Sequence, residues 1–436
     1  MIVLTNVARL YDGTSDEAKS VKTGVDLWID DGRIAEVTEH NPKLEGGEQL
    51  TQVDASKWTI TPGLVDCHGH ITILGLDAKA MEMAEAPANF VYVEKVLYTS
   101  LVDGGVTTMR DIGGATGAMK RMVEDGVVIG PRLKIAICML SSTGGHADFR
   151  GPDRCHAELS KLWPAAPGRP SSIVDGPWEA RKRVREIAAC GGDLIKICSS
   201  PGVASPSDHL EHRDLHPEEV AAICEEAGAR GMRVAAHAHS KSGVRLAAEY
   251  GVSDLQHISF MDEETVDIAH EKGCTVTPTS WILHVLPEAD GLSEFVRDKA
   301  KRARDAHAAA VDYARKGGLP ILAGTDPVLP GMHGRNYMEI VHLIKDGLDP
   351  LQAWWGMTGL AAREIGAQDT GTLVKGQRAD FLICDQDVLS DPGAFERGAL
   401  LEVVQAGRGH RGGVAAIPQR RFDDTVRGLL GERPGS

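Results

Sequence analysis

Two histidines separated by one residue end an apolar run near the beginning of the chain. The run covers residues 61–67 (TPGLVDC), and His68 and His70 follow directly. In an extended strand, residues i and i+2 point to the same face, so both imidazoles can bind one metal ion at the strand end. Because a chain with 17 histidines contains such a pair by chance about once, the interpretation needs support from other residues.

Ionisable residues at the ends of later predicted strands give that support. Lys196 lies in the apolar run 194–198, where burying a free ammonium is costly, unless its head reaches solvent at the strand end. Three further runs carry the other candidates at or near their ends, namely His237 and His239, His257, and Asp326. Each residue alone could be structural, but scattered core histidines would not share one position at the same end of successive strands.

Composition limits the classes of partner. The net charge of −15 argues against a nucleic-acid surface or a polybasic membrane patch, because binding phosphates needs clustered Lys and Arg. We therefore expect a small-molecule substrate. The eight cysteines are scattered, as in reduced cytoplasmic proteins, and no signal peptide or run of 18 apolar residues is present. We expect a cytoplasmic homo-oligomer without nucleic-acid or membrane partners.

The two ends of the chain carry short β-like runs. Residues 25–29 and 34–37 flank an Asp-Gly turn, which predicts a β-hairpin. Similar runs occur near the C-terminus at 371–376, 379–384 and 401–408. We predict that residues 1–60 and 366–420 fold together into one small β-sandwich domain, followed by a tail at 421–436.

The middle, residues 61–365, alternates strand-like and helical segments. The helical segment 217–227 begins with proline, has acidic residues in its first turn and is followed by glycine, as a capped helix does. Such alternation predicts parallel βαβ units, and eight of them form a (β/α)8 TIM barrel whose strand carboxyl ends carry the chemistry. The eight predicted strands lie near 64–70, 107–112, 133–139, 194–198, 233–239, 254–258, 275–279 and 320–326.

These motifs together resemble the amidohydrolase superfamily, in particular its imidazolonepropionase-like and prolidase-like branch. The resemblance covers nearly the whole chain and includes the strand that ends in His68 and His70. Its other motifs are TTMRD at 107–111, GGH at 144–146, IKI at 195–197, HAH at 237–239, QH at 256–257, AGTD at 323–326 and GQRAD at 376–380.

The resemblance implies a centre with two divalent metal ions, most simply zinc. His68, His70 and Asp326 would hold one ion, His237 and His257 the other, and a carboxylated Lys196 would bridge them. Imidazole and carboxylate are ligands that zinc favours, and a carbamate turns a repelled ammonium into an anionic ligand. Asp326 would take a proton from the attacking water and deliver it to the leaving nitrogen.

Four residues are candidates for substrate contacts. His146 lies in a glycine-rich loop after the third predicted strand, and the equivalent residue of this branch resembles a substrate-contacting histidine. His239 shares a face with His237, while Trp281 and His333 follow the seventh and eighth strands. The loop 141–177 is much longer than a usual βα connection, which predicts a lid over the site.

The expected reaction is hydrolysis of a C–N amide-type bond in an N-acyl amino acid or dipeptide, as in prolidases. Its free carboxylate would pair with His146 and His239. An alternative substrate is a neutral amide, carbamate or urea in an apolar pocket formed by Trp281, Met332 and Trp354. A mononuclear deaminase-like hydrolase is disfavoured because such sites lack the lysine, and a non-catalytic scaffold is disfavoured because all six candidate ligands are present.

Overall fold

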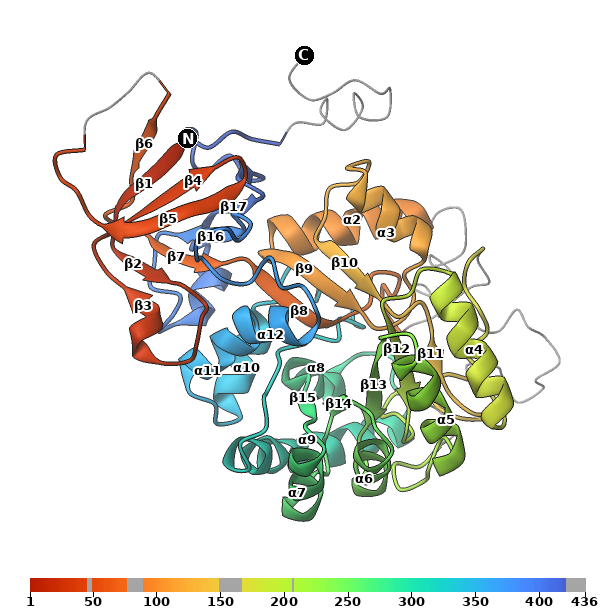
Figure 1. Ribbon diagram of the computed structural model, residues 1–436. Helices are drawn as coiled ribbons and strands as arrows, with labels where there is room; N and C mark the ends of the chain where they lie inside the picture. The colour runs from red at the N-terminus through yellow and green to blue at the C-terminus, as the bar shows by residue number, and fades with distance from the viewer. Residues whose placement is uncertain (45–48, 77–88, 149–166, 206–207, 421–436) are drawn as a thin grey trace.

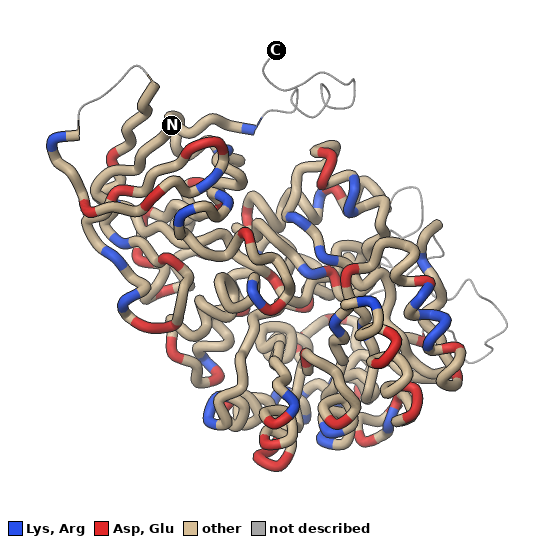
Figure 2. Tube along the Cα trace, viewed as in Figure 1, with Lys and Arg blue, Asp and Glu red and all other residues tan. Residues whose placement is uncertain are grey.

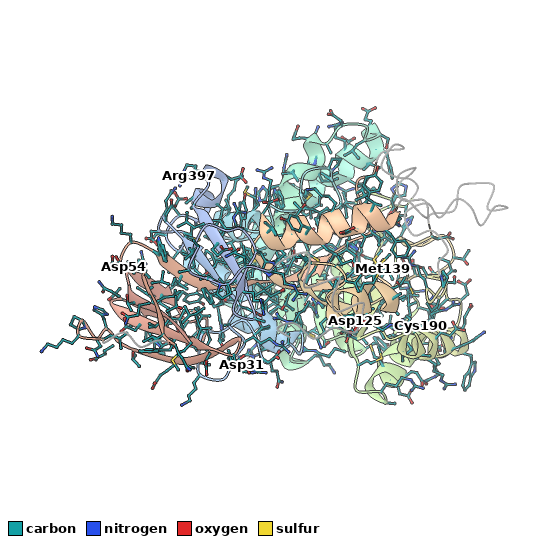
Figure 3. All side chains as sticks on the ribbon, turned by 90° about the horizontal axis from the view of Figure 1, so that it is seen from above. Asp31, Asp54, Asp125, Met139, Cys190 and Arg397 are labelled. Carbon is teal, nitrogen blue, oxygen red and sulfur yellow. The ribbon has the colours of Figure 1, made fainter. Side chains whose placement is uncertain are left out.

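The computed structural model describes residues 1–44, 49–76, 89–148, 167–205 and 208–420 (Figure 1). Its larger part alternates parallel strands with helices, and its smaller part consists of sheets from both chain ends. Viewed from above, Asp54 lies near one end of the molecule and Asp31 in the same half, while Met139, Asp125 and Cys190 lie in the other half (Figure 3).

The larger part contains two parallel sheets with strand orders β10-β9-β8 and β11-β12-β13-β14-β15. Most of their residues are buried, as expected when helices and core side chains cover both faces. The strands are β8 Leu64–Gly69, β9 Val106–Asp111, β10 Arg132–Ile135, β11 Met139–Leu140, β12 Leu194–Cys198, β13 Arg233–Ala238, β14 Asp254–His257 and β15 Thr275–Thr277.

Helices follow these strands along the chain and lie on the outside of the sheets, where α4 to α7 are seen most clearly (Figure 1). Charged side chains lie along these outer helices (Figure 2), with both signs on α4 and α6 and acidic residues alone on α5 and α7. The helices are α2 Asn89–Val102, α3 Gly117–Glu124, α4 Pro177–Ala189, α5 Pro217–Gly228, α6 Lys241–Glu249, α7 Glu263–Glu271, α8 Ser280–Val285, α9 Glu294–Lys316, α10 Met338–Lys345, α11 Pro350–Gly356 and α12 Gly359–Glu364.

Two of the eight predicted barrel strands differ from the prediction. The run 133–139 divides into β10 and β11, because Ile137 adopts a left-handed conformation (φ 68°) between them. The run 320–326 forms only an isolated bridge, Ile321 with Val276. Its backbone nevertheless bonds to both neighbours: Leu322 N–H donates to the Val276 carbonyl and Cys67 N–H donates to the Ala323 carbonyl.

The smaller part contains a four-stranded sheet, β5-β4-β1-β6, and a six-stranded sheet, β18-β17-β16-β7-β2-β3. Strand β7 pairs antiparallel with β16, so the two ends of the chain share one sheet. The strands are β1 Ile2–Val7, β2 Arg9–Tyr11, β3 Val21–Lys22, β4 Val25–Asp30, β5 Arg33–Glu39, β6 Thr51–Asp54, β7 Thr59–Pro62, β16 Phe381–Cys384, β17 Leu400–Gln405 and β18 Arg408–Gly409.

One hydrophobic core joins these two sheets, with Leu4 and Leu27 from the first and Phe381 and Val404 from the second. The predicted hairpin is confirmed as β4 and β5, with Asp31 and Gly32 in the left-handed conformation at its turn. The predicted strand 371–376 is wrong, because this segment is irregular and Leu373 N–H donates to the Asp12 carbonyl outside any ladder.

The predicted helix at 217–227 is confirmed as α5. His216 caps its first turn, Pro217 occupies the first helical position, and the Glu219 carboxylate accepts the His216 N–H at 2.6 Å. Within the described residues, no helix is both long and apolar enough to cross a bilayer. The centre of the predicted lid, 149–166, and the tail 421–436 lie outside the described residues.

Candidate metal centre

Imidazoles from three parallel strands meet at the carboxyl ends of these strands. His68 and His237 lie one residue before the ends of β8 and β13, and His257 ends β14; each is at most 5% exposed. The ring centroids of His257 lie 4.9 Å from His68 and 4.3 Å from His237. The parallel arrangement therefore brings together residues that are 189 positions apart, because 257 − 68 = 189.

The first group of potential metal ligands contains His68, His70 and Asp326. Asp326 Oδ1 lies 3.5 Å from His68 Nε2 and 3.4 Å from His70 Nε2. The backbone positions this carboxylate, since Asp326 N–H donates to the His68 carbonyl at 2.7 Å. Gly324 allows the close approach of the two segments, because a Cβ there would collide with His68.

The second group contains His237, His239 and His257. His239 Nδ1 lies 2.8 Å from Ser259 Oγ, and His257 Nδ1 lies 2.8 Å from Thr279 Oγ1, so each ring keeps its Nε2 for a ligand. Asp326 Oδ2 is 3.9 Å from His257, which places this carboxylate between the two groups. His239, predicted as a substrate contact, thus lies within ligand distance of the predicted metal-binding histidines.

Burial keeps most of these imidazoles neutral. It lowers the pKa of His68, His237 and His257 well below the ordinary value, and nearby cations add to the effect. Burial also lowers the pKa of His70, but Asp326, Asp111 and the Gly113 carbonyl together outweigh it, so the net shift is upward. Among the described residues, His237 Nε2 is buried without a hydrogen-bond partner. Since an unpaired buried nitrogen is costly and a neutral imidazole is a metal ligand, these donors fit divalent cations.

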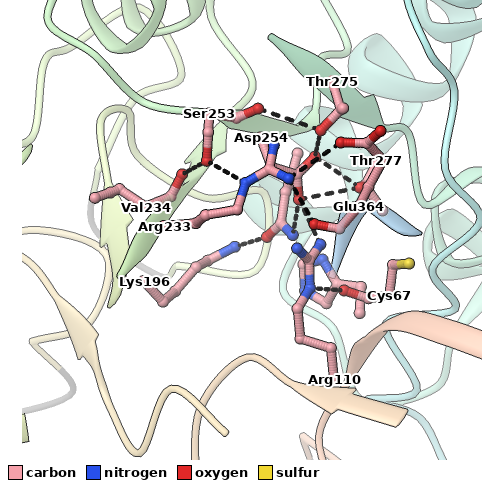
Figure 4. Close-up of polar contacts among 12 residues, drawn as sticks. Cys67, Arg110, Lys196, Arg233, Val234, Ser253, Asp254, Thr275, Thr277 and Glu364 are labelled. Atoms are coloured by element: carbon pink, nitrogen blue, oxygen red, sulfur yellow. Dashed lines mark hydrogen bonds and ion pairs between the residues drawn. The ribbon is translucent and has the colours of Figure 1, made fainter. Parts of the chain in front are cut away.

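Lys196 lies fully buried in β12, below the imidazoles. Its ammonium donates to the Gln256 side-chain oxygen, Gln256 donates to Asp254 at 2.9 Å, and Asp254 pairs with Arg110 (Figure 4). Burial lowers the pKa of Lys196 to about 7. In the described residues Lys196 therefore donates to a neutral amide, and the Asp254 carboxylate of this network pairs with Arg110 instead.

Two buried carboxylates support the strands that carry the candidate ligands, and the sequence analysis did not single out the first of them, Asp66. Asp66 accepts the His68 N–H at 3.0 Å and the Thr325 hydroxyl at 2.5 Å, which joins the two segments of the first group. Asp111 accepts the Ile71 N–H at 2.8 Å. Asp66 was detectable, because it lies two residues before His68 and so on the same face of the strand.

Several residues at this end have left-handed backbones although they are not glycine. His257 has φ 69°, Ile258 49°, Thr279 54° and Asp326 47°. Such conformations are costly for branched side chains and persist only where surrounding contacts impose them. Here they turn the chain sharply at the strand ends, so that the ligand side chains converge.

His146 lies against the second group. Its ring stacks on His237 with centroids 4.1 Å apart, and its Nδ1 lies 2.6 Å from Ser205 Oγ. Asp214 holds its loop by accepting the His146 N–H at 2.8 Å, and a Cβ at Gly202 would collide with the ring. Burial lowers the pKa of His146 to about 4, so the residue is neutral at neutral pH.

A pocket opens above the two groups. Besides the seven ionisable residues His68, His70, His146, His237, His239, His257 and Asp326, its described lining is entirely apolar. The apolar side chains are Ile73, Leu76, Met139, Val203, Ala204, Ile282, Leu283, Leu286 and Val328.

The residues predicted to form an apolar pocket lie behind this lining. Trp281 and Met332 pack with its apolar side chains in one core cluster, and Trp354 is fully buried in another. His333 also lies behind the wall, with its Nε2 3.1 Å from the Ile73 carbonyl. In the described residues Trp281, Met332 and Trp354 do not line the pocket, and Ile282 and Leu283 of α8 line it instead.

Buried polar groups fix α8. The Glu339 carboxylate accepts the N–H groups of Ser280 and Trp281 at 2.9 and 2.8 Å, and Ser280 Oγ lies 3.0 Å from His307 Nε2. Since the first N–H groups of a helix have no partner within it, this carboxylate satisfies two of them. The position of the pocket wall thus depends on a polar cluster behind it.

His307 makes stability depend on pH in a defined direction. Burial lowers its pKa from 6.5 to about 4. Between these values the unfolded chain binds a proton that the native state does not, so the free energy of unfolding falls as the pH falls through this window. Denaturation of metal-free protein at pH 7 and pH 5 should show the loss. In His307→Gln the loss should be smaller by about 2 kcal/mol, and an unchanged loss would contradict this assignment.

Comparisons with known proteins agree with this geometry. The model of the amidohydrolase family matches residues 59–408. The chain belongs to the amidohydrolase family. Ochratoxinase of Aspergillus niger is 30% identical over 369 residues, which cover 81% of this chain and 76% of that protein. Imidazolonepropionase of Ectopseudomonas mendocina (strain ymp) is 25% identical, covering 88% of this chain and 90% of that protein.

A solved structure supports the same branch of the amidohydrolase family. A Xaa-Pro dipeptidase with methionine bound in its active site has a TM-score of 0.83 and 26% identity, and the match covers 94% of this chain and all of that one. The predicted membership in the imidazolonepropionase-like and prolidase-like branch is confirmed. The protein is therefore a hydrolase that acts on carbon–nitrogen bonds of the amide type.

Proposed function

We propose that this amidohydrolase uses two divalent metal ions to hydrolyse an amide bond at the carboxyl ends of β8, β13 and β14. The observation that carries the proposal is the pair of adjacent ligand groups with Asp326 between them. His68, His70 and Asp326 would hold one ion, and His237 and His257 the other. His239, which lies in the second group, would contact either the second ion or the substrate. Zinc suits this set of imidazole and carboxylate donors best.

Lys196 would complete the centre as a carbamate. Its neutral amine attacks the carbon of CO₂; a C–N bond forms as one C=O π bond breaks, and the nitrogen loses a proton to water. The pKa of about 7 that results from burial supports this step, because only the neutral amine can attack CO₂. The resulting anion would be matched by the cations above it, which a buried ammonium would repel.

Asp326 would move the proton that amide hydrolysis requires. Divalent cations bound at the two groups would supply Lewis-acid activation of the attacking water and of the substrate carbonyl. As the C–O bond forms, an Asp326 oxygen takes the proton of the water; it then delivers this proton to the nitrogen as the C–N bond breaks. His146 lines the pocket beside His237 and, being neutral, would donate a hydrogen bond rather than supply a charge.

The substrate would be an N-acyl amino acid or a dipeptide, as the names of ochratoxinase and Xaa-Pro dipeptidase among the relatives suggest. His146 and His239 remain predicted substrate contacts, and both line the pocket. Trp281 and His333 remain predictions too, but each would act through the wall residues in front of it.

The two parallel sheets would be arcs of one (β/α)8 barrel at residues 61–365. The backbone bonds from the segment 320–326 to β15 and β8 support this closure. The shared core of the two other sheets supports a β-sandwich of residues 1–60 and 366–420. We further propose that the enzyme is a cytoplasmic homo-oligomer.

Metal analysis coupled to an activity assay tests the proposal. Chelated protein should be inactive towards N-acyl amino acids, and zinc reconstitution should restore turnover at about two ions per chain. One ion per chain would favour the deaminase-like alternative, and no bound ion would favour a scaffold. Hydrolysis that persists in fully chelated protein would contradict a metal-dependent mechanism.

A further inference from the structure

The metal centre can act on many amides, whereas the pocket wall above it can distinguish their substituents. Three side chains of the α8 region, Ile282, Leu283 and Leu286, line it from one side, and each is at most 4% exposed. Val203 from the loop after β12 and Val328 from the segment after Asp326 also line it. A substrate group in contact with these residues meets carbon atoms only.

No lysine or arginine lines the pocket among the residues that the structure describes. Besides Lys196, the described part of the chain places two buried cations, Arg110 and Lys299, near the centre, and both are already paired. Arg110 binds Asp254 below the centre, and Lys299 donates to Asp208 and to the carbonyls of Gly202 and Ser205. Against the described apolar wall, a substrate carboxylate would therefore meet no lysine or arginine, which is unfavourable.

The wall is also held in place. Lys299 fixes the loop that carries Val203, and Glu339 fixes the start of α8. A wall fixed by buried hydrogen bonds keeps its shape when no substrate is bound. An apolar group can therefore bind to it without a free-energy cost for ordering the wall.

We propose that this pocket selects amides by an uncharged apolar group, such as a branched alkyl or phenyl group, seated against Ile282, Leu283 and Leu286. The inference rests on the proposed function, which it refines: whichever amide is hydrolysed, the group that the pocket recognises is an apolar substituent next to the scissile bond. A free carboxylate adds nothing to recognition in this pocket.

Two substrate sets test the inference on zinc-loaded enzyme. The first varies one side of the amide at a time, with acyl groups from acetyl to hexanoyl and benzoyl on 4-nitroaniline, and acetyl on amines of increasing size. In one of the two series kcat/KM should rise about fourfold for each added methylene that is buried. The second set compares N-acetylphenylalanine with N-acetyl-2-phenylethylamine, which differ only in the carboxylate. Their kcat/KM values should agree within about tenfold.

Wall variants connect the trend to named residues. Leu283→Ala should lower kcat/KM for the largest apolar substrate about tenfold more than for acetyl-4-nitroanilide. Val285→Ala, on the same helix but outside the pocket lining, should leave this ratio unchanged. Because truncating a buried leucine can prevent folding, Ile282→Val and Val203→Ala repeat the test with smaller changes.

The outcomes separate the two proposals. If the zinc-loaded enzyme hydrolyses none of these amides nor a dipeptide, the proposed function fails. If it hydrolyses Gly-Pro or N-acetylphenylalanine more than tenfold better than the uncharged substrates, with no dependence on apolar size, the function stands and the apolar selection is wrong.

Discussion

Replacing Lys196 with alanine is expected to reduce metal affinity at one of the two sites by more than ~100-fold and to remove most turnover. Loss of an outer partner of a ligand already costs about 10–100-fold in affinity, and a bridging ligand contributes more. Metal content per chain after dialysis, measured beside kcat with an N-acyl amino acid, checks this. Short carboxylic acids such as acetate or propionate should restore part of both, because they can occupy the space of the carbamate.

Lys299→Met provides a matched control, since Lys299 is also a buried lysine. Its ammonium donates to the carbonyls of Gly202, Ser205 and Asp208 and to the Asp208 carboxylate. None of these partners belongs to the two groups of potential metal ligands. This variant should lose stability but keep about two ions per chain. Full metal content and activity in Lys196→Ala would reduce Lys196 to a structural lysine.

The ligand geometry was predictable because it follows from the regularity of strands. His68 and His70 share a face by the two-residue period, and the carboxyl ends of parallel strands meet at one edge. His257 and Asp326 therefore meet the pair although they lie in distant parts of the sequence. The same two-residue period places His237 and His239 on one face. It does not predict which of these two histidines would bind a metal ion.

The segment 320–326 shows what a hydrophobic pattern alone does not predict. Its apolar run places Asp326 correctly, yet the segment forms one bridge instead of a strand, because Pro320 has no N–H to donate and Asp326 turns into the left-handed conformation. Pattern predicts where an element lies. It does not predict the left-handed backbone conformations, which occur at or beside the candidate ligands His257 and Asp326, where local contacts impose them.

The pocket wall could not be predicted from the sequence. Trp281 attracted the prediction as the largest apolar side chain after β15, but α8 begins at Ser280 with its N–H groups bound to Glu339, 59 positions away. That long-range bond sets the rotation of the helix and so decides that Leu283, rather than Trp281, lines the pocket. No local signal in the sequence contains this information.

Asp326→Asn is expected to keep the fold and lower kcat by at least two orders of magnitude, the usual scale of general acid–base catalysis. An amide keeps the size and one oxygen of Asp326 but accepts no proton from water at neutral pH. The fold should persist because the backbone bond from Asp326 N–H to the His68 carbonyl does not involve the side chain.

Turnover in Asp326→Asn must be compared with wild type at equal metal occupancy, since Asp326 also belongs to a ligand group. At that occupancy kcat should stay low, because the amide cannot take a proton from water. Asp326→Glu, which keeps a carboxylate but moves it by one methylene, should recover part of the rate. Near-normal kcat in Asp326→Asn with two ions bound would remove Asp326 from proton transfer and leave it a role in metal binding alone.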